Sequence, residues 1–219
     1  MKNEGLIYRI SGPVVTAINM KAAMYDVVRV GTEGLMGEVI ELHGEKAVIQ
    51  VYEDTSGIRP GEVVVNTGET LSVSLGPGLL TQIYDGIQRP LPTLEKEMGV
   101  FLTRGVDADA FDLEKIWTFE PQVAVGDTVI GGQVVGHVQE TDTIVHKIMV
   151  VPGNGGVVKS IESGDFNVTQ TICTFEDGSE MQMMQEWPVR TPRPYNQKYP
   201  PVIPLVTGMR ILDFLFPLA

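Results

Sequence analysis

Short runs of β-branched residues, separated by glycine-containing turns, limit most strongly what the first 75 residues can fold into. Such residues favour strands, whereas Ser-Gly-Pro and single glycines favour turns. Seven strands at about ten-residue spacing predict a small closed barrel, which leaves no sheet edge exposed. The predicted strands are 6–10, 14–18, 27–30, 38–42, 47–51, 62–65 and 71–75.

Residues 76–111 have a different pattern. Leu79, Leu80, Ile83, Tyr84 and Ile87 keep helical spacing, Pro77 suits a first helical turn and Pro90 would end it. We therefore expect one helix between Pro77 and Pro90 and a shorter one over 94–102.

Residues 112–186 return to short strands and tight turns. The stretch 123–138 predicts strand, turn and strand, and 144–151, 156–161 and 171–176 predict further strands. Asp177-Gly is a hairpin signal before Met181. We expect a second all-β unit inserted into the first fold.

The last stretch, residues 187–219, is rich in proline, and we call it the strap. It holds seven of the fourteen prolines, and six of them precede Thr207. Each proline ring fixes φ and removes a donor, so an extended path is expected up to Thr207. Thr207 would then cap a short helix that Pro217 stops. The helix has an apolar face with nothing after it, so we expect a truncated chain. That face comprises Met209, Ile211, Leu212, Leu215 and Phe216.

Composition excludes several classes of protein. The formal charge of −12 disfavours nucleic acid, because phosphate binding needs a basic surface. Cys173 is the one cysteine, so no internal disulfide can form, and its strand-like context favours a buried apolar role over a nucleophile. The N-terminus has no signal-peptide core and no run reaches membrane-spanning length, so we expect a soluble, cytoplasmic chain.

Two groups of motifs carry a resemblance to a known family. In the strap they are Pro188-Val-Arg-x-Pro-Arg-Pro, Pro204-Leu-x-Thr-Gly-x-Arg-Ile-Leu-Asp and Phe216-Pro-Leu-Ala. In the barrel they are Ile10-Ser-Gly-Pro-Val-Val, Leu35-x-Gly-Glu-Val-Ile and Gln50-Val-Tyr-Glu-Asp-Thr-Ser-Gly-Ile-Arg-Pro-Gly-Glu. Together they closely resemble the catalytic A subunit of archaeal-type and vacuolar-type rotary ATPases. Ser74 departs from this pattern, where an acidic residue is expected, and should change only a local contact.

The resemblance implies a division of the chain. Residues 1–75 would form a barrel in the crown of an alternating A/B hexamer, and 76–111 would be a helical connection belonging to a nucleotide-binding domain. Without that domain the apolar faces of 76–111 would be partly exposed, which predicts an aggregation or dimerisation patch. Residues 112–186 would be an inserted bulge with a lipoyl-like β-sandwich. Residues 187–219 would be the proline-rich strap and first helix before the phosphate-binding loop, an incomplete start of an α/β domain.

The resemblance also implies partners and cofactors of the parent complex. The parent couples ATP synthesis or hydrolysis to proton or sodium translocation, on the cytoplasmic side of a membrane, as a peripheral complex. This chain would contact B subunits, reach the peripheral stalk through the bulge, and meet the central stalk only through the full-length parent. ATP or ADP and Mg²⁺ would bind the full-length parent, and no cofactor is expected here.

No catalytic site is predicted in these 219 residues. The phosphate-binding pattern Gly-x4-Gly-Lys-[Ser/Thr] is absent, as is any Gly-Lys pair. Without a backbone nest, its lysine and a magnesium-binding hydroxyl, phosphoryl transfer lacks charge stabilisation. Gly76-Pro-Gly is better read as helix capping than as an anion site, and Gly153-Asn-Gly-Gly as a turn. We expect no ATP hydrolysis by this chain alone.

Other candidate residues have simpler interpretations. His43, His137 and His146 lack metal-ligand spacing, and the acid pairs Glu53-Asp54 and Asp107/Asp109 are typical of solvated turns. We predict no catalytic, cofactor-binding or metal-binding residue.

Two further readings of the chain stay open. One is a stand-alone, non-catalytic assembly module. The other is a lipoyl- or biotinyl-type carrier using Lys147, although this lysine lies in an apolar run and not at a turn; snorkelling or a contact between subunits also fits it. Arg190 and Arg193 either pack the strap onto the barrel or pair with carboxylates across a domain boundary or an interface between subunits.

Overall fold

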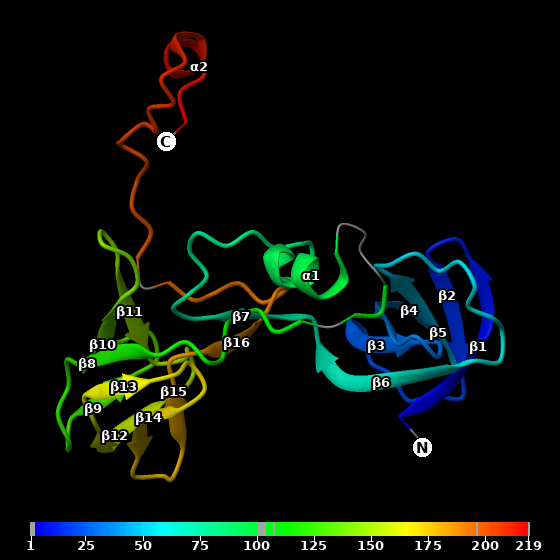
Figure 1. The fold of residues 1–219 in the computed structure, drawn as a ribbon, viewed down its shortest axis with the longest axis horizontal. Helices are drawn as coiled ribbons and strands as arrows, with labels where there is room; N and C mark the ends of the chain where they lie inside the picture. Colours follow the sequence, from blue (N-terminus) through cyan, green and yellow to red (C-terminus); the bar gives the residue numbers. More distant parts are fainter. Residues whose placement is uncertain (1–2, 100–103, 107, 196, 219) are drawn as a thin grey trace.

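The computed structural model describes residues 3–99, 104–106, 108–195 and 197–218. It places two β domains side by side, with a two-stranded ribbon and the helix α1 (Leu91–Met98) between them (Figure 1). The fold is mainly β, as predicted.

The first domain is a closed antiparallel barrel in the order β1-β2-β5-β4-β3-β6. Alternate residues point inward along its strands, so β5 reads exposed, buried, intermediate, buried from Lys46 onward. The strands are β1 (Glu4–Ser11), β2 (Val14–Ile18), β3 (Asp26–Val30), β4 (Leu35–His43), β5 (Lys46–Val51) and β6 (Val63–Thr70).

The seven-strand barrel prediction is wrong in its last strand. β7 (Ser72–Leu75) leaves the barrel and pairs antiparallel with β16 (Gln185–Pro188), 110 residues later in the chain. In this ribbon Leu75 lies opposite Gln185, and Ser72 lies opposite Pro188. The chain therefore enters and leaves the region 76–184 at one place.

The helix predicted between Pro77 and Pro90 does not form. Thr81 and Gln88 have φ values of 67° and 64°, which no right-handed helix allows. The Asp85 carboxylate accepts the amides of Ile87 at 3.0 Å and Arg89 at 2.8 Å, and such local bonds compete with helical ones. The helix predicted over 94–102 starts earlier, as α1, and residues 100–103 lie outside the described part.

The second domain consists of two packed four-stranded sheets, β11-β10-β8-β13 and β15-β14-β12-β9. Its core is apolar, with Phe119, Val135 and Val168 wholly buried. The strands are β8 (Trp117–Pro121), β9 (Thr128–Ile130), β10 (Val134–Gln139), β11 (Val145–Met149), β12 (Gly155–Ile161), β13 (Gly164–Phe166), β14 (Thr171–Phe175) and β15 (Glu180–Gln182).

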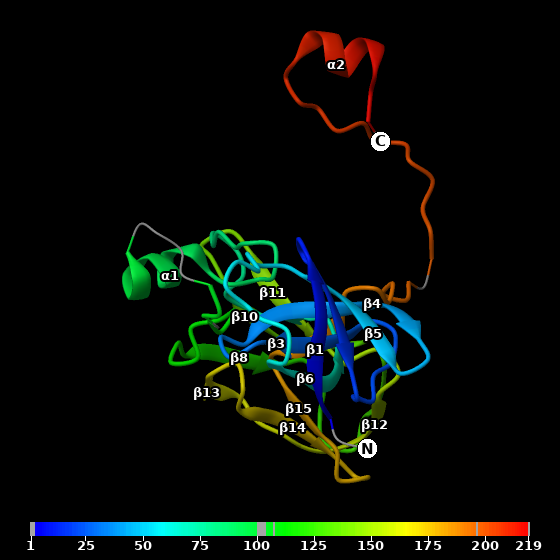
Figure 2. The same cartoon turned by 90° about the vertical axis from the view of Figure 1, so that its right-hand side faces the viewer.

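Beyond Arg193 the strap runs away from both domains to α2 (Arg210–Leu215) (Figure 2). Met209 stands at the N-cap, and the Thr207 hydroxyl accepts the Met209 amide at 3.1 Å. The expected apolar face is exposed throughout, with Ile211 at 68% and Phe216 at 69%. In the described part of the chain, no helix is both long and apolar enough to span a membrane.

Candidate functional site

The glycine-rich segment 76–78 does hold an anion, but an internal one. The amides of Gly78 and Leu80 donate to one oxygen of the Glu140 carboxylate, at 2.7 Å and 3.3 Å. The other oxygen is 2.8 Å from Nδ1 of His146. The side chain of Glu140 is only 3% exposed. A carboxylate from the sandwich therefore occupies the segment that the sequence offered as a possible phosphate cradle.

This environment lowers the pKa of Glu140. Burial pushes that pKa up, but the Gly78 amide, the His146 side chain and the Leu80 amide together lower it more. The carboxylate is therefore held in its charged form by groups from two different parts of the chain.

The second glycine loop, 153–156, is a turn into β12. The Asn154 amide donates to the carbonyl of Val151 at 3.0 Å, and Gly155 already pairs with Ile130 of β9. This agrees with the predicted turn. The first of these two glycine segments thus donates its amides to Glu140, and the second pairs with β9.

The three histidines lie apart, each beside one carboxylate. His43 is 2.8 Å from Glu41, His137 is 3.3 Å from Glu120, and His146 contacts Glu140. Among the described residues no three His, Cys, Asp or Glu side chains gather as metal ligands would.

Lys147 and Cys173 lie within strands. Lys147 is exposed in the middle of β11, opposite His137, whereas the tip of that hairpin lies at Thr141–Ile144. Modified carrier lysines need a tight turn, so this placement does not favour a carrier. Cys173 is 1% exposed, and burial raises the pKa of its thiol, as suits a packed apolar residue.

Arg190 joins the strap to the barrel across 152 residues of sequence. Its guanidinium donates from Nε to Oε1 of Glu38 at 2.9 Å and from Nη2 to Oε2, and it lies over the ring of Tyr25 at 4.4 Å. Tyr52 donates its hydroxyl to the same carboxylate at 3.0 Å. The two interpretations of Arg190, packing of the strap onto the barrel and pairing with a carboxylate, both apply, because the strap contacts the barrel through the Glu38 carboxylate.

Glu38 is the barrel's most deeply buried charge, 1% exposed in the middle of β4. The hydrogen bond from Arg190 lowers the pKa of Glu38 most, burial raises it, and the Tyr52 hydroxyl lowers it further. Burial and the neighbouring Glu38 charge raise the pKa of Tyr52. Glu38 was not predicted as a contact residue, and its strand also carries Glu41 and His43, so residue type alone did not single it out.

Arg193 packs within the strap and ribbon. Its guanidinium lies 4.5 Å from the ring centre of Trp187, and Nη2 donates to Gln185 at 3.1 Å. Ser74, which departs from the family pattern, donates its hydroxyl to Glu186 across the same ribbon. These contacts are local to the ribbon.

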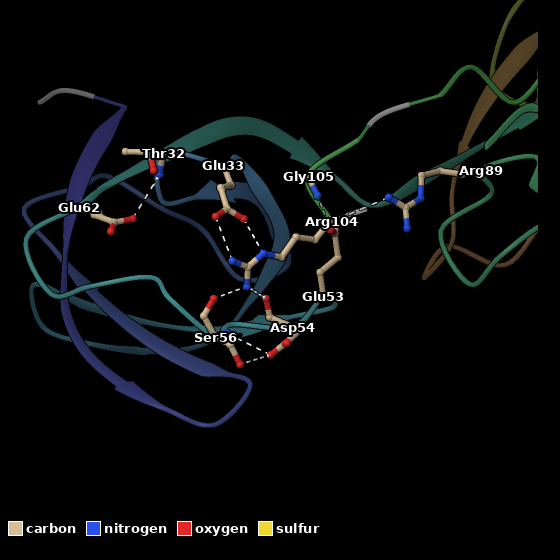
Figure 3. A network of polar contacts seen from close by, with 9 residues as sticks. All are labelled: Thr32, Glu33, Glu53, Asp54, Ser56, Glu62, Arg89, Arg104 and Gly105. Atoms are coloured by element: carbon tan, nitrogen blue, oxygen red, sulfur yellow. Dashed lines mark hydrogen bonds and ion pairs between the residues drawn. The ribbon is translucent and has the colours of Figure 1, made fainter. Parts of the chain in front are cut away.

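A second cluster joins the barrel to the connection, residues 76–111 (Figure 3). Arg104 binds both oxygens of Glu33, at 2.6 Å and 3.0 Å, and donates to the carbonyls of Asp54 and Ser56. Glu53 accepts the Gly105 amide at 2.5 Å and lies 3.6 Å from Nη1 of Arg89.

The prediction that the acid pairs lie in solvated turns is wrong for Glu53, whose side chain is mostly buried. The Glu53 side chain is 9% exposed and bridges two parts of the chain, whereas Asp54 caps its own loop through Ser56. Asp109 belongs to the connection, and Asp107 lies outside the described residues.

The outer face of the barrel carries an apolar stripe on the neighbouring strands β1 and β6. Leu6 lies directly opposite Val63, and Glu4 lies opposite Val65. Leu6, Tyr8, Val63 and Val65 are 39–54% exposed. Cross-strand partners share one face, so these four side chains form one continuous surface, which we call the barrel stripe.

Comparisons with known proteins agree with this architecture. Residues 7–68 match the model of the ATP synthase alpha/beta family, beta-barrel domain. Residues 108–190 match the model of the ATPsynthase alpha/beta subunit barrel-sandwich domain.

Curated relatives match the whole chain. It is 61% identical over all 219 residues to the A subunit of the A-type ATP synthase of Methanosarcina barkeri, and 60% identical over the same length to that of Methanosarcina mazei. It is 61% identical over 216 residues to the corresponding protein of Methanocorpusculum labreanum. The chain spans 37–38% of the length of these relatives. With a barrel, an inserted sandwich and this identity over its full length, the chain belongs to the ATP synthase alpha/beta family.

Proposed function

We propose that the chain is the assembly part of the A subunit in an A-type ATP synthase. Its barrel would contact B subunits in an alternating hexamer, and its sandwich would reach outward to the peripheral stalk. The proposed parts are the barrel 1–75, the connection 76–111, the sandwich 112–186 and the strap 187–219. The parent complex would lie on the cytoplasmic side of a membrane and couple ATP synthesis or hydrolysis to proton or sodium transport.

The barrel stripe carries this proposal. Exposed apolar side chains that form one surface on a rigid barrel favour docking to another protein, because water solvates them poorly. The interior of the same barrel is fully packed, with Val15, Leu35 and Ile49 at 0% exposure. The barrel therefore has a complete core without the side chains of the stripe.

The sandwich has a different surface. Residues 112–186 hold twelve Asp and Glu residues against three lysines and no arginine, so this domain carries most of the chain's net negative charge. Val125 and Ile130 are 63% and 69% exposed on it. An acidic domain with exposed apolar residues favours a partner with basic residues, which is the chemistry proposed for the stalk contact.

We place catalysis in parts of the full-length parent outside these 219 residues. The nucleotide and Mg²⁺ would bind residues beyond this chain, because its two glycine segments are engaged by Glu140 and by β9. We expect the purified chain to hydrolyse no ATP above a buffer control.

The proposal is tested by titrating the chain against a purified B subunit of an A-type ATP synthase and following binding by native mass spectrometry. Replacing Val63 and Val65 by lysine should weaken binding at least tenfold, since it places two charges on the stripe. Ile130→Lys on the sandwich is the matched control and should leave binding unchanged. Unaltered binding by the stripe variant would contradict a barrel contact with the B subunit.

A further inference from the structure

Two routes join the barrel to the sandwich, and only one of them is the ribbon. The ribbon has four residue pairs, and its barrel end is fastened by Arg190 to Glu38. A two-stranded ribbon of this length is marginally stable and twists readily. By itself it would allow the sandwich to swing relative to the barrel.

The connection forms the second route, and its barrel end is the cluster of Figure 3. Glu53 binds the Gly105 amide at 2.5 Å and faces Arg89, while Glu33 binds Arg104 through both oxygens. Gly105 has a φ of 72°, and a Cβ added there would lie 2.4 Å from the carbonyl oxygen of Glu33. The backbone of the connection therefore lies directly against the β3–β4 turn of the barrel.

The sandwich end of the connection is the Glu140 site. The carboxylate reaches from the β10–β11 hairpin to the amides of Gly78 and Leu80. Nearby, the Tyr84 hydroxyl donates to the carbonyl of Ala110 at 2.9 Å, which ties the beginning of the connection to its end. Each end of the connection thus has a carboxylate that is at least nine-tenths buried, Glu53 or Glu140.

Between its two ends the connection is braced internally. Arg89 binds Asp85 from Nε at 2.7 Å and the carbonyl of Val106 from Nη1 at 2.7 Å. The same guanidinium faces Glu53, so the internal brace and the barrel attachment share one side chain.

We propose that the connection is a strut that fixes the angle between the sandwich and the barrel, with Glu33 and Glu53 attaching one end and Glu140 the other. An attachment away from the ribbon removes the swing that the ribbon alone permits. The strut belongs to the 219-residue chain itself and needs no second protein, so its test is separate from that of binding to the B subunit.

The charged and titratable side chains around the attachments define what can loosen them. Among the described residues, Glu140 faces His146 and Tyr84, and Glu53 faces Arg89. Glu33 faces Arg104. Both attachments are made through carboxylate oxygens, so removing a carboxylate should release one end without touching the other.

Distances between paired spin labels test the strut. Labels are placed through Glu45→Cys on the barrel, Gln82→Cys on the connection and Glu162→Cys on the sandwich, all exposed positions. Cys173 is 1% exposed and is kept. The parent chain without introduced cysteines, treated with the same label, checks that Cys173 takes up none. Pulsed electron spin resonance then gives the width of each distance distribution.

The two ends should respond separately. Glu140→Ala should at least double the width for the pairs 82–162 and 45–162 and leave the pair 45–82 narrow. Glu33→Ala with Glu53→Ala should broaden 45–82 and 45–162 and leave 82–162 narrow. Glu176→Ala, an exposed carboxylate on the sandwich, should change none of them.

A broad 45–162 distribution in the parent chain would overturn the strut, and so would alanine variants that leave this distribution narrow. If an alanine variant loses its circular dichroism spectrum, Glu140→Gln and Glu53→Gln replace it. These keep the side-chain size and lose the charge, and the same broadening is expected of them.

Discussion

The barrel and the outer strap, residues 194–218, are both rich in apolar residues, yet they use them in opposite ways. In the barrel, residues such as Val28, Leu35 and Ile49 are wholly buried. In the outer strap, Ile203, Phe214 and Phe216 are 69–82% exposed. The barrel closes on itself because alternation with period two gives each strand an inner face. The strap has six prolines before Thr207, which remove the donors that a sheet would need.

Hydrophobic content alone therefore does not place a residue in a core. Burial needs a backbone whose polar groups can be satisfied at the same time. The barrel strands satisfy theirs with each other. In the outer strap, the Leu205 amide donates to the Leu218 carbonyl at 2.7 Å, which joins two residues of the strap itself and buries neither of them.

The largest effect should separate the two regions directly. Leu35→Ala should lower the free energy of unfolding by about 2–5 kcal/mol, because it leaves a cavity in a packed core. Phe214→Ala should change it by less than about 0.5 kcal/mol, because the ring is 81% exposed. Urea unfolding followed by circular dichroism measures both. Similar losses for the two variants would mean that the outer strap packs against the body.

A smaller effect is expected where the strap meets the barrel. Arg190→Ala removes the main partner of the buried Glu38 carboxylate and should destabilise the chain at neutral pH. Adding Glu38→Gln removes the stranded charge and should restore about 1–3 kcal/mol, the usual cost of a buried unsatisfied polar group. A double variant no more stable than Arg190→Ala would show that the unpaired Glu38 carboxylate costs no folding free energy.

The same pair predicts a change in pH dependence. The folded-state pKa of Glu38 is lowered, so its contribution is full above the ordinary glutamate range and is lost as pH falls through the lowered value. In Arg190→Ala, burial without the guanidinium should raise that pKa above the ordinary range. The variant should then gain stability on acidification from pH 7 to 5, whereas the parent should not. Unfolding free energies at pH 5, 6 and 7 give the comparison.

Local patterns predicted much of this fold. Period-two runs of β-branched residues located the six barrel strands, and glycine turns located most of the sandwich strands. These features depend on residues close together in the sequence, where propensity and pattern agree.

The features that sequence patterns missed depend on distant partners. β7 looks like one more barrel strand, and only its partner 110 residues later draws it out of the barrel. The carboxylate contacts of Glu38, Glu53 and Glu140 were missed for the same reason, since each partner lies in another part of the chain. The helix predicted between Pro77 and Pro90 is an exception, because the bonds from the amides of Ile87 and Arg89 to the Asp85 carboxylate that oppose it are local.

The smallest effect concerns the outer strap by itself. Lys198 is exposed in a stretch without helix or strand among the described residues, so trypsin should cut the native chain first after Lys198. Arg190 lies in a comparable sequence but is held by Glu38 and Tyr25, so it should resist. The fragment ending at Lys198 should have the same free energy of unfolding in urea as the intact chain, within about 0.5 kcal/mol, because the removed residues contribute no core. Mass spectrometry of the first product identifies the cut. Cleavage after Arg190 before Lys198 would show that Arg190 does not hold the strap on the barrel. The exposed region would then include the whole strap from Trp187 onward.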